Sequence, residues 1–243
     1  MRKKLKEFVR QGDQAELKGN IDKITHKSDA VRRWIQENAV RSEERVVFEN
    51  LLESSRSCIE IVKSSMNMHI SVLALAARSI FEINIRVRSL TESKEQMANW
   101  ICEAAMDKIQ IFEGILTLGH EPENSEKVNC LKDEVIRLKE LVVKYDLPKI
   151  KSPESSGSLA KKFGQEAEHK ALYKLFSKLV HPSSFLVNDY SNASSDPIRV
   201  ILQVHSQLYA QETINRIFNT LNVPFDVYKR NGEAMETVFE TRE

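Results

Sequence analysis

The sequence predicts an all-α protein, and three observations carry that prediction. Its 243 residues include only seven glycines and six prolines, less than half of average usage. Because these residues form the turns that many-stranded sheets require, a β sandwich or barrel is excluded. Residues 20–113 contain neither residue type, which indicates long helices joined by short polar turns. Apolar residues also recur at the spacing of a helical face, so we expect a single bundle of about seven helices with a long central hairpin.

The chain divides by composition into three parts. Residues 1–40 are expected to form an N-terminal helical extension, and residues 41–222 the helical bundle domain. Residues 223–243 read as a C-terminal acidic tail, because glutamate is the dominant charged residue near the end of the chain.

Two helices are expected in the first half of the bundle. Within residues 48–62 the apolar positions fall on one helical face. Residues 67–90 are apolar nearly all round, which predicts a helix at the centre of the fold.

A helical hairpin is expected next, over residues 93–118 and 125–145. Ser93 begins a capping-box sequence that opens the first of these helices, and Gly119 is a suitable residue to end it. The second helix repeats apolar residues at alternating spacings of three and four, a heptad-like pattern that suits an antiparallel partner or a dimer face.

The last third contains the breaks in the helical pattern. Residues 148–158 read as a linker, and a helix over 165–181 should end at His181, since a residue before proline avoids the helical region. Residues 182–196 read as a loop. The last helix runs from Pro197 to about residue 221, and its apolar stripe changes face, so it either kinks or contacts two different partners.

Charge, cysteine and histidine usage narrow the possible functions. The net charge of +1 gives no overall field toward nucleic acid or an anionic membrane. The three cysteines lie far apart, which indicates a reducing, cytoplasmic location. The longest uncharged apolar run, residues 70–77, is too short to cross a bilayer, so no membrane association is expected. No phosphate-binding loop or histidine cluster occurs, so we expect neither a metal nor another cofactor.

Two polar ladders stand out against this apolar background. Arg78, Glu82 and Arg86 are spaced four apart on the helix expected at the centre. Tyr173, Ser177 and His181 are spaced four apart on the helix over 165–181. Charges among apolar neighbours must be paired, so the ladders are expected to face each other.

Two interpretations of such a cluster remain open. Arg78, Glu82, Tyr173, Ser177 and His181 either form a structural network that fixes the register of two helices, or they form a site. In a catalytic site His181 would be the general acid or base, and Arg78 would bind phosphate or stabilise developing charge. Five lysines between residues 158 and 182 add a possible basic rim, in which Lys174 and Lys178 are candidate ligand-binding residues.

The same residues carry a family resemblance. The run from Arg78 to Glu82 and the later Tyr-x3-Ser-x3-His-Pro element at 173–182 resemble an uncharacterised group of bacterial all-helical proteins, a domain of unknown function. By overall type the group is similar to the HEPN proteins, which include ribonuclease toxins and bacterial defence effectors. The resemblance implies an intracellular helical bundle without an established reaction.

HEPN nucleases use an arginine followed four to six residues later by a histidine. Arg199 and His205 match that spacing, but a match of this kind is expected by chance in a chain of this composition. On a continuous helix the two side chains would point about 120° apart. We therefore expect either a non-enzymatic interaction or regulatory protein, with a protein partner or as a homodimer, or a metal-independent ribonuclease that uses His181 with Arg78 and binds RNA.

Overall fold

The computed structural model describes residues 9–119, 122, 125–148 and 153–228. Within these ranges every regular element is helical and none is a strand, which confirms the all-α prediction. The elements, in chain order, are α1 Gln14–Asn38, α2 Glu43–Ser64, α3 Ile70–Glu92, α4 Lys94–Thr117, α5 Glu126–Lys144, α6 Ser156–Lys162, α7 Glu166–Val180, α8 Ser184–Asn188, α9 Tyr190–Ala193, α10 Asp196–Thr220 and the 3-10 turn η2 Phe225–Val227.

The chain forms two compact units. Of the described residues, those in 9–91 and 156–228 make up the first unit, and those between 92 and 155 make up the second. The domain boundaries expected after residues 40 and 222 both lie inside the first unit and stay predictions. Most of the expected acidic tail, residues 229–243, lies outside the described residues.

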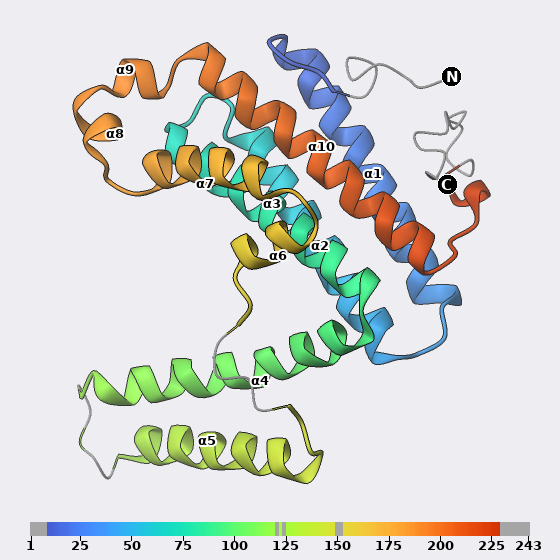
Figure 1. Ribbon diagram of the computed structural model, residues 1–243, viewed down its shortest axis with the longest axis vertical. Coiled ribbons are helices and arrows are strands. Elements are labelled where there is room, and N and C mark those ends of the chain that lie inside the picture. The colour runs from blue at the N-terminus through green and yellow to red at the C-terminus, as the bar shows by residue number, and fades with distance from the viewer. Residues whose placement is uncertain (1–8, 120–121, 123–124, 149–152, 229–243) are drawn as a thin grey trace. The chain divides into compact units, whose positions relative to one another are not determined.

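Three long helices form one side of the first unit. α1 packs against α2 and α10, and α10 also packs against α2, so helices from the two ends of the described chain lie side by side (Figure 1). The apolar positions of α1, among them Ile21 and Ile35, are fully buried. Burial of such side chains is the main favourable contribution to the stability of this contact.

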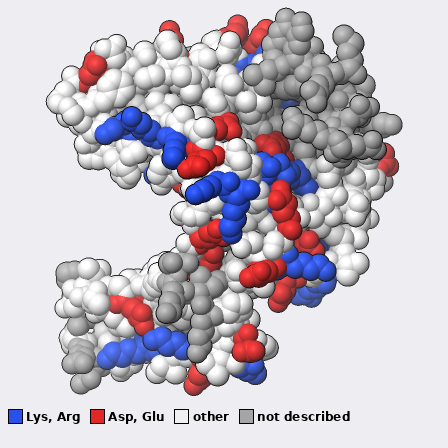
Figure 2. Space-filling model, viewed as in Figure 1, with Lys and Arg blue, Asp and Glu red and all other residues white. Residues whose placement is uncertain are grey.

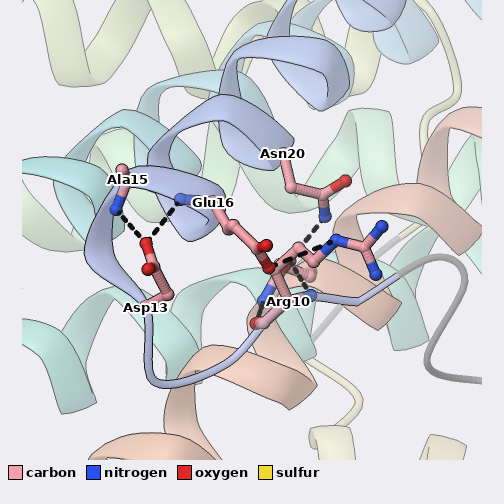
Figure 3. A network of polar contacts seen from close by, with 6 residues as sticks. Arg10, Asp13, Ala15, Glu16 and Asn20 are labelled. Atoms are coloured by element: carbon pink, nitrogen blue, oxygen red, sulfur yellow. Dashed lines mark hydrogen bonds and ion pairs between the residues drawn. The ribbon is translucent and has the colours of Figure 1, made fainter.

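A buried amide joins α1 to α10 at the start of the fold. Asp13 caps α1 by accepting hydrogen bonds from two N–H groups of its first turn, at 2.8 and 3.0 Å. Close by, the Gln207 side-chain oxygen accepts the backbone N–H of Arg10 at 3.1 Å and the Asn20 amide at 2.5 Å (Figure 3). Gln207 is only 1% exposed, so these bonds satisfy a group that would otherwise be costly to bury.

α3 lies in the core of the first unit, as its apolar sequence predicts. The Phe81 ring contacts the rings of Phe176 and Tyr209, and the buried Asn84 amide bonds to the Tyr209 carbonyl at 3.4 Å and to Thr213 at 3.3 Å. Burial is not complete, however. Leu75 is 52% exposed on the other face of the helix, so α3 is covered on most sides but not on all.

The second unit is the expected helical hairpin. Ser93 caps α4 by accepting the Gln96 N–H at 3.3 Å, and Gly119 follows α4 with a φ of +64°, the left-handed conformation that glycine favours at this position. The core of the hairpin consists of Ile109 of α4 with Val135 and Leu138 of α5.

The heptad stripe of α5 is occupied within this hairpin. Val135 and Leu138 belong to the predicted stripe, and both are buried against α4 residues. The stripe is therefore not available as a dimer face. The homodimer stays a prediction, and this surface gives no support for it.

The last third of the chain is more helical than the sequence predicts. The expected linker, residues 148–158, includes the start of α6, and its residues 149–152 lie outside the described part. The expected loop at 182–196 contains α8 and α9, because Ser183 caps a turn by accepting the Leu186 N–H at 3.1 Å. α10 is one continuous helix that contacts α1 and α2, so its shifting stripe reflects different partners.

Within the described residues, none of the helices combines the length and the apolarity that crossing a bilayer requires.

Candidate functional site

The two predicted ladders meet at Arg78. Its Nε donates a hydrogen bond to Glu82 at 3.0 Å along α3, and its Nη2 donates to the Tyr173 hydroxyl of α7 at 2.5 Å. The guanidinium also lies over the Tyr173 ring, 4.6 Å from its centroid, a favourable cation–π geometry. The Arg78 and Glu82 side chains are 21% and 37% exposed, so the cluster lies at the edge of the core.

His169, which was not among the predicted ladder residues, completes this contact. His169 stacks on Tyr173 with ring centroids 5.0 Å apart, and its Nε2 is 3.1 Å from the Ser156 hydroxyl at the start of α6. His169 precedes Tyr173 by four residues, so extending the ladder by one step toward the N-terminus would have found it. The His169 side chain therefore links α6 to the ladder of α7.

Burial also affects the charge of His169. It lowers the pKa of the imidazole, while the Glu82 carboxylate opposes that shift. The neutral imidazole is thus favoured near pH 7.

A second carboxylate contact lies on the other side of α7. The Tyr209 hydroxyl of α10 donates a short hydrogen bond to Glu168. Burial, together with this carboxylate, raises the pKa of Tyr209 far above its ordinary range, so the phenol stays protonated. The contact joins α7 to α10.

The remaining members of the predicted cluster lie apart from Arg78. α7 runs antiparallel to α3, since His169 lies near Phe81 and Tyr173 contacts Arg78. Ser177 is half-buried and His181, which ends α7, is exposed. Among the described residues, no hydrogen bond connects either of their side chains to Arg78 or Glu82.

The predicted basic rim lies on the solvent face of α7. Lys174 and Lys178 are both exposed, and neither is ion-paired with a carboxylate in the described part of the chain. Lys170, one turn earlier, pairs with Glu166 at 2.9 Å. Lys and Arg side chains gather along α7 on the face shown in Figure 2.

The second candidate pair, Arg199 and His205, does not converge. Arg199 donates hydrogen bonds to the carbonyl oxygens of Met66, Met68 and Ser194, at 2.9, 3.2 and 3.0 Å. His205 Nδ1 is 2.8 Å from the Ile201 carbonyl of its own helix. Both residues lie on the continuous helix α10, so their side chains point about 120° apart.

The geometry of the cluster suits a role in holding helices together. Two donor groups of Arg78 are used by Glu82 and Tyr173, and the described residues contain no group of three or more His, Cys, Asp or Glu side chains that could hold a metal. The arrangement fixes α3, α6 and α7 relative to one another.

Comparison with known proteins places the chain in a family. A family model described as a family of unknown function, DUF5677, matches residues 44–197. No curated protein and no solved structure matches the chain. The matched range covers more than half of the sequence and includes the segments around Arg78 and Tyr173, as expected for an uncharacterised family, while the likeness to HEPN proteins stays a prediction. The chain therefore belongs to the DUF5677 family of unknown function.

Proposed function

We propose that the protein is a non-enzymatic helical interaction or regulatory protein, and that its polar cluster is structural. The observation that carries this proposal is that the Arg78 side chain already has protein partners. Its guanidinium is hydrogen-bonded to Glu82 and Tyr173 and stacked on the Tyr173 ring. These contacts hold the guanidinium between α3 and α7, as a structural role requires.

Exposed apolar side chains support an interaction role. Leu75 is 52% exposed although α3 is otherwise a core helix, and Met68, in the turn directly before α3, is 51% exposed. Exposed apolar groups that lie together are typical of protein contact surfaces.

We place the protein in the bacterial cytoplasm, as a possible component of a defence or toxin system with a protein partner or as a homodimer. All three cysteines, Cys58, Cys102 and Cys130, are free, which is consistent with a reducing compartment.

A HEPN-like ribonuclease is the second candidate, and one observation favours it. His181 is exposed at the end of α7, with the unpaired Lys178 one turn before it. Lysines attract phosphate groups, and a histidine side chain can serve as a general acid or base. His181 does not contact Arg78, so such an enzyme would act without the arginine that the sequence suggested.

An RNA cleavage assay separates the two candidates. The full chain and its His181→Ala variant are incubated with structured and unstructured RNAs in the presence of a chelator. The interaction proposal expects the same background cleavage from both proteins. Cleavage by the wild type that the variant loses, with an unchanged circular dichroism spectrum, would refute it.

The partner itself is tested by co-purification from the cells that produce the protein. Leu75→Asp is expected to release a co-purifying protein, while Val46→Asp, a change at a similarly exposed position of α2, retains it. If both variants still co-purify with the partner, the exposed surface of α3 does not bind it.

A further inference from the structure

One side of the first unit carries a continuous apolar strip. Val72 and Leu75 of α3 are 37% and 52% exposed, and their spacing of three residues places them on one helical face, on the solvent side of a helix whose other residues are largely buried. Met68, in the turn directly before α3, is 51% exposed and completes the strip. Three exposed aliphatic side chains in this order form a surface that a second helix can pack against.

The apolar strip continues onto α9, which lies beside the start of α3, and the preceding helix α8 also carries an exposed apolar residue. Val187 is 64% exposed and Tyr190 is 37% exposed. The Tyr190 ring stacks on His69 at 4.7 Å, and its hydroxyl accepts the Ile70 N–H at 3.4 Å. These contacts hold α9 beside the start of α3.

The turn at one end of the strip is held in place. Arg199 donates hydrogen bonds to the carbonyl oxygens of Met66 and Met68 at 2.9 and 3.2 Å. The strip is therefore preorganised, which lowers the entropic cost of binding.

The helix next to α3 carries a basic edge. α7 lies beside α3 through the bond between Arg78 and Tyr173, and its solvent face carries Lys174, Lys178 and His181, all exposed. Because α7 is antiparallel to α3, these residues follow Tyr173 toward the end of α3 that bears the strip. The resulting surface is apolar along α3 and positively charged along α7.

We propose that this surface, the α3–α7 face, binds an amphipathic helix of a partner protein that has aliphatic residues on one side and Asp or Glu along one edge. This inference rests on the proposed interaction function. Such a helix would pack its apolar side on the strip, and its carboxylates would lie against the lysines. The charge complementarity would speed association and select for acidic partners.

Two other occupants fit less well. RNA binding relies on aromatic side chains that stack with bases, whereas the strip is mainly aliphatic. A second copy related by twofold symmetry would present the same patch, so it would bring Lys174 and Lys178 near their own counterparts and repel.

The experiment is a selection from a display library of helical peptides against the full chain. Binders to Leu75→Asp are removed in a counter-selection. The enriched peptides are expected to share aliphatic residues spaced three and four apart, together with a net negative charge. Enrichment of neutral or basic peptides, or no enrichment, would overturn the inference.

Binding of one enriched peptide is then measured by fluorescence anisotropy. Leu75→Asp and the double variant Lys174→Glu, Lys178→Glu are each expected to raise Kd by about tenfold or more. The matched controls Val46→Asp and Lys18→Glu, which change exposed residues of α2 and α1, should change Kd by less than about twofold.

A single-stranded RNA of similar charge is measured in parallel. Tighter binding of RNA that depends on the lysines and not on Leu75 would overturn the peptide inference in favour of RNA. A failure of the peptide experiment would leave the proposed function intact if a co-purifying partner were still released by Leu75→Asp. Cleavage of RNA that requires His181 would instead refute the proposed function itself.

Discussion

Replacing Arg78 with alanine is expected to lower the free energy of unfolding of the first unit by about 2–3 kcal/mol. The bond to Tyr173 joins a charged donor to a partly buried hydroxyl and contributes roughly 1–1.5 kcal/mol. Stacking on the ring adds about 0.5–1 kcal/mol, and the pair with Glu82 adds about 0.5 kcal/mol. A fully buried pair would cost more to break, but the two side chains are 21% and 37% exposed, so water replaces part of what is lost.

The measurement is urea unfolding followed by circular dichroism, with the melting temperature as a second readout. A loss of this size corresponds to about 4–12 °C. Lys170→Ala is the matched control, because it breaks an i,i+4 pair of α7 whose lysine is 75% exposed and should cost less than about 0.5 kcal/mol. A change at Arg78 no larger than the change at Lys170 would refute the structural role of the cluster.

Three further changes test other parts of the fold. Burial lowers the pKa of His169, so the neutral imidazole costs nothing above the unfolded pKa of about 6.5, and protonation of this residue destabilises the fold as pH falls below that value. His169→Gln should therefore show a smaller decrease in melting temperature between pH 7.5 and 5.5 than the wild type, and an identical decrease would contradict the assignment. Asp13→Ala removes the cap of α1 and should cost about 1 kcal/mol in urea unfolding, whereas no change would show that water replaces the cap. Ile109→Ala, at a position 3% exposed in the hairpin core, should cost about 2–5 kcal/mol, and hydrogen exchange should increase in α4 and α5; unchanged protection there would argue against the hairpin packing.

Helix positions were largely predictable from the sequence. The segments expected at 93–118, 125–145 and 165–181 correspond to α4, α5 and α7 within a residue or two at each end. Local signals set those ends, such as the Ser93 cap and the proline after His181. The short helices α8 and α9 were missed, because a single turn buries too few apolar residues to give a periodic pattern.

The candidate site was only partly predictable. The four-residue spacing correctly brought Arg78, Glu82 and Tyr173 together, since residues at that spacing share a helical face. It also implied that Ser177 and His181 would join them, but among the described residues no hydrogen bond connects either side chain to Arg78 or Glu82. His169 was missed although it continues the same ladder, because its contact with Ser156 involves a helix that the sequence assigned to a linker.

The sequence by itself determined the helical class, the positions of the long helices and the faces that carry charge, because each of these depends on residues within a few turns of one another. The tertiary structure alone decided which faces are covered. It buried the heptad stripe of α5 against α4, used Arg199 to hold a turn and left Leu75 exposed on a core helix. Burial depends on contacts between residues distant in sequence, and a pattern of spacings contains no information about which distant segment supplies them.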